Sequence, residues 1–378
     1  MVGDPKPGQR IGRLTPLAEA LAAVDAIARP VEPKDADIAA ALGRVLAADI
    51  NAPTPLPLGD VALRDGWAVQ SAATTDASSY TPALLSAPPK RVDAGQPMPA
   101  NTDAVALLDT VVMRGATAEI VATVAPGEGV LLAGADVQPG LALRLAGERL
   151  RGIDQALLAA ADVAKVAIRE PRIRLVGARG SDAAIAQGYE WLAQTLIAAG
   201  AAVIPDTDVS VAPDYLEAAF HHEASDAILV LGGTGEAMTD QSVTTLTKAG
   251  RIVFHGVGLL PGETAAFGSV GARSVLLLPA RLDAALAAWL AVGRHWLRAL
   301  SGERDDDKSA IVQLARKVTS TVGMAEVVAV RCNGANAEPL ASGYLSLAAL
   351  SRADGWILVP PESEGYPAGA QVAVRPFP

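Results

Sequence analysis

Apolar residues recur at helical spacing near the start of the chain. Between Leu17 and Ile27 they lie three or four positions apart, and Pro30 then stops the pattern. The same spacing returns at Ile38, Leu42 and Leu46. Both patterns are typical of helices with one buried face, so a helical hairpin is predicted at the start of the chain.

A proline-rich stretch separates this region from a different pattern. Residues 51–59 hold three prolines and a glycine, which disfavour both helix and ladder pairing and predict an extended connection. From there to about residue 142, short alternating runs such as 104–108 and 118–124 are separated by Gly and Pro turns. The pattern predicts a small inserted β domain over 51–142.

Helical periodicity resumes after this β segment. Ile153, Leu157 and Leu158 share one helical face, and a strand is expected at 163–168. We therefore interpret residues 1–50 and 143–170 as one discontinuous helical domain interrupted by the β domain.

The next region, 171–304, alternates between strand and helix patterns, which predicts a parallel sheet with right-handed crossovers. The expected strands are 173–177, 202–204 and 227–231, and the expected helices are 189–199 and 214–222. A charged connector at 302–308 then leads to a C-terminal β domain over 305–378, with strands at 325–331, 356–359 and 371–375. The predicted fold is thus a multidomain α/β protein.

The strand at 227–231 ends in the segment Gly232-Gly-Thr-Gly235, with Asp240 shortly beyond. Continuous apolar residues fit a strand buried on both faces, and the glycines allow a close backbone approach to a ligand. Ligands of open α/β sheets bind at such carboxyl ends. The alternative is an ordinary glycine turn without a ligand.

Composition narrows the function. The 378 residues carry a net charge of −10 with no long Lys/Arg cluster, which argues against nucleic acid as a partner. The single cysteine, Cys332, excludes an intrachain disulfide and a thiolate metal cluster. With no signal-peptide pattern and no apolar run long enough for a membrane span, a cytoplasmic protein is expected.

Segments along the whole chain carry recognisable motifs. The most specific is Leu63-Arg-Asp-Gly-Trp-Ala-Val69, which contains an Asp-Gly-aromatic-Ala sequence. The others are Ala41–Ile50, Pro97–Val105, Gly134–Gly140, the glycine loop with Phe254–Leu278, and Gly343–Val374. In this order they resemble the molybdopterin molybdotransferase family, the molybdenum-insertion enzymes related to the E domain of gephyrin.

The resemblance implies a reaction and a ligand. Adenylylated molybdopterin and molybdate would be the substrates, molybdenum cofactor and AMP the products, and Mg²⁺ the assisting cation. The region 171–304 would be the molybdopterin-binding domain. A homodimer is implied, because the family's cleft combines domains of two subunits. Other cofactor biosynthesis proteins or apo-molybdoenzymes are candidate protein partners.

Site residues follow from the matching positions. The resemblance assigns catalytic roles to Asp65, Asp136 and Asp240, and Asp65 and Asp240 are the expected metal ligands. The expected ligand-binding residues are Gly232, Gly233, Thr234, Gly235, Pro261, Gly262, Pro279 and Arg281. Each aspartate also has a structural alternative, because Asp65 and Asp136 fit turns and Asp240 fits a cap of the helix expected near Ser242. His255 faces the same loop either as a ligand contact or as a surface imidazole.

The chain departs from the family pattern around the expected cleft. The family's Lys-Pro-Gly-Lys block is Leu260-Pro-Gly-Glu263, its Pro-Gly-Asn-Pro turn is Pro279-Ala-Arg-Leu282, and its acidic turn corresponds to residues 177–182. Loss of two cations weakens the expected binding of phosphate or molybdate, unless Arg179 or Arg281 replaces them.

Three interpretations remain open from the sequence. The chain inserts molybdenum, or it is a non-catalytic paralogue that carries molybdopterin or serves as a scaffold for a partner. The third is binding of an unrelated phosphorylated ligand at the same sheet edge.

Overall fold

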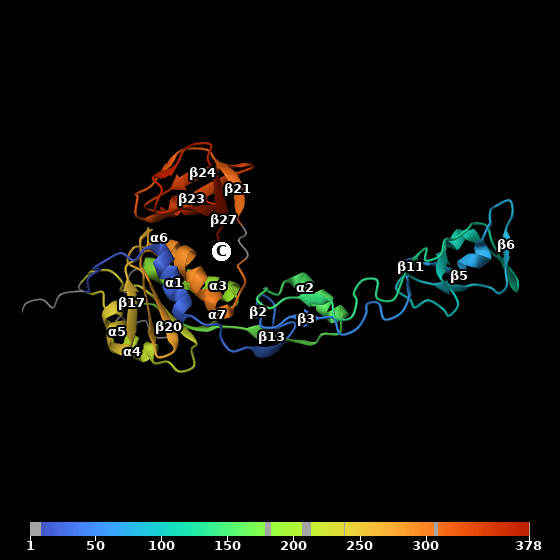
Figure 1. Cartoon of the computed structure of the whole chain (residues 1–378), viewed down its shortest axis with the longest axis horizontal. Helices are drawn as coiled ribbons and strands as arrows, with labels where there is room; N and C mark the ends of the chain where they lie inside the picture. The colour runs from blue at the N-terminus through green and yellow to red at the C-terminus, as the bar shows by residue number, and fades with distance from the viewer. Residues whose placement is uncertain (1–8, 178–182, 206–212, 238, 306–308, 378) are drawn as a thin grey trace, which may run out of the picture. The chain divides into compact units, whose positions relative to one another are not determined.

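The computed structural model describes residues 9–177, 183–205, 213–237, 239–305 and 309–377 (Figure 1). The chain divides into two compact units. The first contains residues 1–48, 146–151 and 166–378, and the second contains residues 49–145 and 152–165. The multidomain α/β fold expected from the sequence is confirmed, with an α/β sheet domain and a C-terminal β domain in the first unit.

The α/β domain is built on a mixed sheet. Among the described residues its strand order is β15-β14-β16-β20-β19-β17. The strands β14, β15, β16 and β20 run parallel, and β19 and β17 add antiparallel pairs at one edge. Their bounds are β14 Arg172–Gly177, β15 Ala202–Pro205, β16 Ala227–Leu231, β17 Arg251–His255, β19 Ala266–Val270 and β20 Arg273–Leu278.

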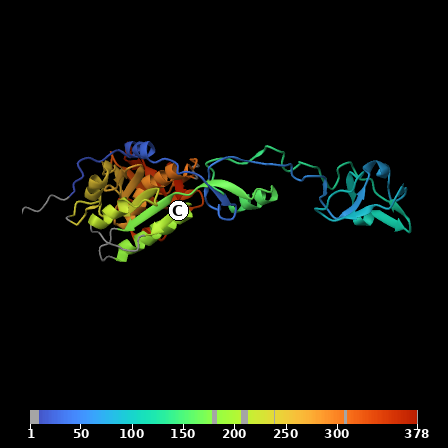
Figure 2. The same cartoon turned by 90° about the horizontal axis from the view of Figure 1, so that it is seen from below.

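Helices cover both faces of this sheet (Figures 1 and 2). Leu229 and Leu231 face a core shared with α1, α3, α6 and α7, whereas Ile228 and Val230 face α4 and α5. Burial on both sides explains the uninterrupted apolar run of β16. The helical bounds are α1 Leu17–Ile27, α3 Ala183–Ala198, α4 Pro213–Phe220, α5 Ser242–Ala249, α6 Leu282–Ala288, the π-helical turn η3 Trp289–Gly293, and α7 Arg294–Ser301.

The predicted helical hairpin is wrong in its second helix. The chain forms α1, but turns at 38–43 and the strand β2 (Val45–Leu46) stand where the second helix was expected, and the strand β1 (Lys34–Asp37) precedes them. Both strands pair with β13 (Lys165–Arg169), in the order β1-β13-β2. Gly43 adopts a left-handed φ of 73°, which interrupts any helix there. Pairing with a distant strand therefore overrides the local helical spacing.

The second unit consists mainly of short strands. Among its described residues, the larger sheets have the orders β7-β5-β8 and β6-β10-β9, and the pairs β11-β4 and β12-β3 complete the ladders. The bounds are β3 Ile50–Asn51, β4 Val61–Ala62, β5 Gly66–Val69, η1 Ser71–Thr74, β6 Ala83–Leu85, β7 Lys90–Val92, β8 Ala104–Ala106, η2 Leu108–Thr110, β9 Val111–Arg114, β10 Thr117–Ile120, β11 Val130–Leu131, β12 Ala142–Arg144 and α2 Gly152–Ala160. The helix expected around Ile153–Leu158 is α2.

The C-terminal domain is a small closed barrel. Its strands follow the order β23-β24-β21-β27-β25, and β25 pairs back with β23. The strand β18 (Leu259–Leu260) of the α/β domain extends it by pairing with β23. The bounds are β21 Ala310–Leu314, β22 Val318–Thr319, β23 Ala325–Asn333, β24 Asn336–Ala341, α8 Leu347–Leu350, β25 Gly355–Val359, β26 Gly365–Tyr366 and β27 Gln371–Pro376.

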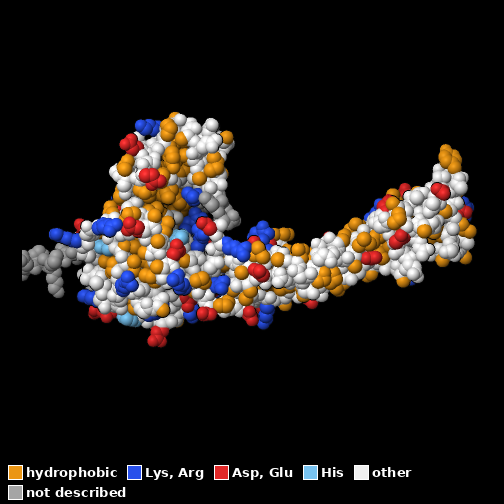
Figure 3. Space-filling model, viewed as in Figure 1, with side chains coloured by type: hydrophobic (Ala, Val, Ile, Leu, Met, Phe, Trp, Pro, Cys, Tyr) orange, Lys and Arg blue, Asp and Glu red, His pale blue; other side chains and the backbone are white. Residues whose placement is uncertain are grey.

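An ion pair holds the connector before this barrel to residues 146–151 of the same unit. Glu303 forms a bidentate ion pair with Arg149, with N–O distances of 2.6 and 3.0 Å. Residues 306–308, which complete the expected charged connector, lie outside the described residues. Acidic and basic side chains intermingle on the face shown in Figure 3. Every helix in the described ranges is too short or too polar to traverse a bilayer.

Candidate functional site

A cavity of about 200 Å³ opens at the carboxyl ends of β16 and β20. Both strands run parallel and end beside each other, so the loops that follow them meet at one sheet edge. The lining residues are Gly233, Thr234, Gly235, Asp240, Glu263, Thr264, Pro279, Ala280, Arg281 and Ala284. The cavity therefore combines the glycine loop, residues 232–236, with the turns before α5 and α6.

Two glycines are required by the shape of this loop. Gly233 has a φ of 68°, and a Cβ there would lie 2.3 Å from Ser242 Oγ. A Cβ on Gly235 would lie 2.6 Å from a carboxylate oxygen of Asp240. Gly233 thus combines a left-handed backbone with a close approach to α5. Any larger residue at this position would be strained.

The glycine loop presents a run of free backbone donors. Within the described residues, the N–H groups of Gly233, Thr234, Gly235 and Glu236 have no hydrogen-bond acceptor. By contrast, the N–H of Gly232 donates to the carbonyl of Leu278 at 2.8 Å. Where successive unpaired N–H groups converge, they attract an anion, because each contributes a partial positive charge.

Neighbouring side chains hold the loop from behind. Ser242 Oγ donates to the carbonyl of Gly232 at 2.9 Å, and His255 Nε2 donates to the carbonyl of Thr234 at 2.9 Å. His255 is partly buried and does not line the cavity. Its contact is therefore to the loop backbone.

The expected aspartates lie in both units. Asp240 lines the cavity, and its carboxylate accepts a hydrogen bond from the Ala237 N–H at 3.3 Å. The N-cap residue of α5 is Gln241, and Asp240 accepts from Ala237 and not from an N–H of this helix, so it does not serve as the cap. Asp65 and Asp136 belong to the second unit and are exposed. Asp65 Oδ1 accepts from the Ala94 N–H at 2.8 Å, across 29 positions of sequence, so this contact is not a local turn.

Arg281 supplies positive charge to the cavity. Its Nε donates to Asp283 Oδ1 at 2.6 Å, and its guanidinium lies 5.7 Å from the ring centre of Tyr344. Asp283 is only 3% exposed, and within the described residues its other oxygen has no hydrogen-bond partner. A buried carboxylate requires a compensating charge, so Arg281 is held at the rim of the cavity.

The substituted Leu260-Pro-Gly-Glu263 block lies beside the glycine loop. Thr264 Oγ1 and Thr234 Oγ1 are 2.9 Å apart, which joins the two loops. Glu263 lines the cavity, and its carboxylate accepts from the Gly262 N–H at 3.0 Å. Pro261, Gly262 and Gly232 are buried and support the loops without lining the cavity.

The structure answers one part of the charge question raised by the sequence. Arg281 lines the cavity that Leu260 and Glu263 leave without their family lysines. Arg179 and the acidic turn at 178–182 lie outside the described residues. Thr264, Ala280 and Ala284 line the cavity without a sequence signal that singled them out.

The cavity has oxygen ligands for a hard cation. Asp240, Glu263 and the hydroxyls of Thr234 and Thr264 are the available groups. Among the described residues, no cluster of three or more His, Cys, Asp or Glu is arranged to hold a metal. Mg²⁺ commonly binds through one or two carboxylates together with substrate phosphates, so these residues fit a shared magnesium site.

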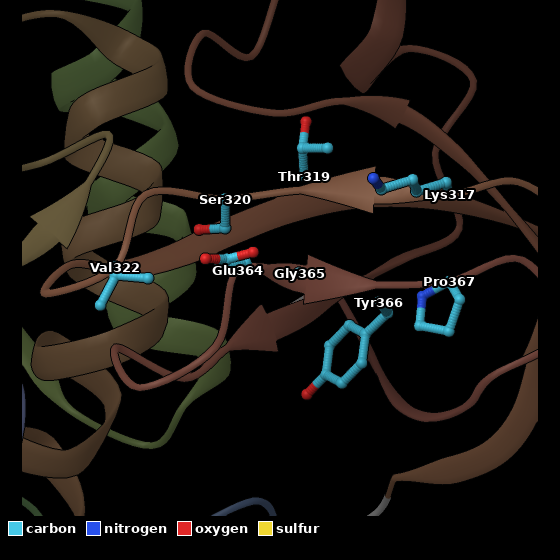
Figure 4. Close-up of a pocket in the computed structure, with 8 residues that line it drawn as sticks. All are labelled: Lys317, Thr319, Ser320, Val322, Glu364, Gly365, Tyr366 and Pro367. Atoms are coloured by element: carbon cyan, nitrogen blue, oxygen red, sulfur yellow. The ribbon is translucent and has the colours of Figure 1, made fainter.

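A larger cavity of about 460 Å³ lies on the C-terminal barrel beside β22 and β26 (Figure 4). Lys317 and Glu364 are its only charged lining residues among those described, and both are exposed. Figure 4 shows Ser320 and Glu364 together at one end and Lys317 at the other. This cavity contains none of the site residues expected from the sequence.

Comparison with known proteins assigns consecutive parts of the chain to family models. The MoeA N-terminal region (domain I and II) matches residues 15–161, and the probable molybdopterin binding domain matches residues 181–299. The MoeA C-terminal region (domain IV) matches residues 312–377. Together the three models cover most of the chain in consecutive order.

Individual proteins show the same similarity. A putative molybdopterin biosynthesis protein of Methanocaldococcus jannaschii is 26% identical over 90% of this chain and 91% of its own length. The molybdopterin molybdenumtransferase 1 of Mycobacterium tuberculosis is 25% identical over 81% of this chain and 83% of its own. The crystal structure of a molybdopterin biosynthesis MoeA protein from Pyrococcus horikoshii has a TM-score of 0.78 at 24% identity. It covers 97% of this chain and 100% of that chain, which shows a shared fold.

Proposed function

Because the chain belongs to the MoeA family of molybdenum cofactor biosynthesis proteins, we propose that it binds adenylylated molybdopterin and inserts molybdenum from molybdate, with release of AMP. The observation that carries this proposal is the run of free N–H groups in the glycine loop. The substrate has a phosphoanhydride, and negative charge grows on the AMP phosphate as this bond breaks. Preorganised N–H donors stabilise such charge.

Arg281 adds a positive charge to these fixed donors. Asp283 and Tyr344 hold its guanidinium near the cavity rim, where it reaches phosphate or molybdate oxygens. Guanidinium groups bind tetrahedral oxyanions through paired N–H donors. In this proposal Arg281 takes over part of the role of the family's lysines.

The carboxylates would serve a different part of the substrate. Asp240 and Glu263 would hold Mg²⁺ together with the ligand's phosphates. A bound Mg²⁺ supplies positive charge that offsets the phosphate oxygens. Asp240 also closes the turn at Ala237, which fixes its carboxylate beside Gly235.

A carrier or scaffold is the second candidate. It is favoured by Leu260 and by Glu263, whose carboxylate is engaged with the neighbouring Gly262 N–H. An apolar residue and an anion at these positions reduce the positive charge around the cavity. Such a protein would bind molybdopterin without turning it over.

The discriminating experiment is molybdate-dependent AMP release from adenylylated molybdopterin in the presence of Mg²⁺. Wild type is compared with an Asp65→Ala/Asp240→Ala variant and with Asp109→Ala/Asp214→Ala, which removes two exposed aspartates outside the expected site. Release lost only in the first variant supports insertion. If folded wild-type protein binds molybdopterin but releases no AMP, the proposal of an insertion enzyme is rejected. The carrier or scaffold then becomes the favoured function.

The homodimer and the cytoplasmic location stay predictions. Light scattering tests the first, since a dimer has twice the chain mass of 38.5 kDa. A monomeric mass at assay concentration would contradict the predicted two-subunit cleft.

A further inference from the structure

The segment before α1 reaches the ligand loop and bonds to its backbone. Gln9 Nε2 donates to the carbonyls of Gly233 and Gly235, both at 2.7 Å, and Gln9 Oε1 accepts from the Thr244 N–H at 3.3 Å. We propose that Gln9 is a positioning residue of the ligand site, which keeps the N–H groups of the glycine loop available for phosphate. The inference rests on the proposed phosphate binding at this loop.

The geometry of the peptide bond connects Gln9 to the free donors. In a trans peptide the C=O and the following N–H point in opposite directions. The carbonyl of Gly233 shares its peptide with the N–H of Thr234, and the carbonyl of Gly235 shares its peptide with the N–H of Glu236. By holding both carbonyls, Gln9 turns both N–H groups away from itself.

With Gln9 included, every free donor belongs to an anchored peptide. Ser242 holds the carbonyl of Gly232, Gln9 and the Ser242 N–H hold that of Gly233, and His255 holds that of Thr234. Gln9 alone holds that of Gly235 among the described residues. Anchored peptides do not need to reorient when an anion binds, which is the property of a preorganised site.

Several contacts fix the segment that carries Gln9, which passes β17 and α5 (Figure 1). The Ile11 N–H donates to Glu236 Oε1 at 3.0 Å, and the Thr15 N–H donates to the Gly256 carbonyl at 3.0 Å. A Cβ on Gly256 would lie 2.6 Å from Ile11 Cγ2, so the backbone there leaves room for this segment. These contacts of the neighbouring residues fix the position of the Gln9 carboxamide. Its position therefore does not require a ligand in the cavity.

Binding of AMP and of adenosine separates a positioning role from a general structural one. We would measure both by calorimetry for wild type, Gln9→Ala, Gln9→Glu and the control Gln194→Ala. Gln194 also donates through Nε2, but only to Glu190 on the exposed side of α3. Thermal unfolding midpoints verify that each variant is folded.

The expected result is a loss specific to phosphate. Gln9→Ala removes both hydrogen bonds to the loop carbonyls and the one from the Thr244 N–H, and it should weaken AMP binding about tenfold, with adenosine binding unchanged within about twofold. Gln9→Glu places an acceptor against two carbonyls and should weaken AMP binding further. Gln194→Ala should match wild type. Equal losses for AMP and adenosine, or wild-type AMP binding by both Gln9 variants, would overturn the proposal.

A second measurement does not depend on the ligand. The Ser242 N–H donates to the Gly233 carbonyl, so hydrogen exchange at Ser242 reports whether that carbonyl is still held. Exchange should be faster in Gln9→Ala than in wild type and unchanged in Gln194→Ala. If wild type fails to bind AMP, the proposed function fails, whereas unchanged exchange in Gln9→Ala rejects the positioning role itself.

Discussion

The two cavities of the first unit differ in what their backbone offers. The cavity on the C-terminal barrel is larger, about 460 Å³ against about 200 Å³, but its strands β22 and β26 pair with each other. The smaller cavity is lined by a loop in which the N–H groups of residues 233–236 have no acceptor among the described residues. On our proposal, unpaired donors held by neighbouring side chains, and not cavity volume, distinguish the ligand site.

The largest effect is expected for Gly233→Ala. The change adds a Cβ 2.3 Å from Ser242 Oγ at a φ of 68°, so the loop must move and its donors diverge. We expect AMP affinity to fall about 100-fold or more, which corresponds to about 3 kcal/mol. Calorimetry measures the loss.

Gly271→Ala is the matched control for backbone strain. Gly271 has a similar φ of 59°, and a Cβ there meets nothing within 4 Å. Both alanines should lower the unfolding midpoint, but only Gly233→Ala should affect AMP. Equal AMP affinities for the two variants would show that the glycine loop does not bind AMP.

A gain of affinity is expected for Glu263→Lys. The change replaces an anion in the cavity lining by a cation and restores the family's residue type at this position. Partial solvent exposure screens the added charge, so we expect AMP to bind about tenfold tighter at low salt. Glu364→Lys makes the same exchange in the barrel cavity and should leave AMP affinity unaltered. If AMP affinity rises in Glu364→Lys and not in Glu263→Lys, the barrel cavity is the AMP site.

A smaller loss is expected for Arg281→Gln. The Arg281 side chain is 60% exposed, so its interaction with an anion is partly screened, and we expect AMP to bind about fivefold weaker. The amide of the new residue retains a donor for the buried Asp283. Lys317→Gln in the barrel cavity is the control. The difference between the two variants should shrink as salt rises, and a salt-independent difference would argue against a charge effect.

The smallest effect should concern stability alone. Burial raises the pKa of Glu170, but hydrogen bonds from Lys34 and Arg44 outweigh it and hold the pKa below its usual 4.5. A lowered folded-state pKa stabilises the protein above the unfolded value and loses this contribution as pH falls through the folded value. Glu170→Gln should therefore cost about 1 kcal/mol at pH 7 and progressively less below pH 4.5. Urea unfolding of wild type and Glu170→Gln at pH 7 and below pH 4.5 measures this cost. If the difference in unfolding free energy is the same at both pH values, the ion pairs are not its cause.

The sequence predicted the parts of the fold whose burial creates a regular pattern. The strand expected at 227–231 has those bounds in β16, because helices bury both of its faces. The region Ile38–Leu46 has helical spacing but forms turns at 38–43, and its last two residues pair with β13, more than 100 residues away. Local spacing contains no information about such a partner, which is why the second helix was predicted wrongly.

The same distinction applies to the candidate site. Asp240 and Arg281 follow motifs next to strands, and both line the cavity. Gln9 reaches the glycine loop across 224 positions of sequence, through hydrogen bonds that leave no periodic signal. Thr264 likewise faces Thr234 from a loop whose path depends on β18 and the barrel.

The free donors of the glycine loop are main-chain groups, and this affects how the protein tolerates divergence. Every amino acid except proline contributes the same N–H, so replacement of Thr234 or Glu236 leaves the donor in place. An anion site that depends on lysine side chains changes when those residues are replaced, and this chain has Leu260 and Glu263 where the family resemblance implies lysines. An anion site formed by peptide groups survives such drift for as long as the glycines that shape it persist.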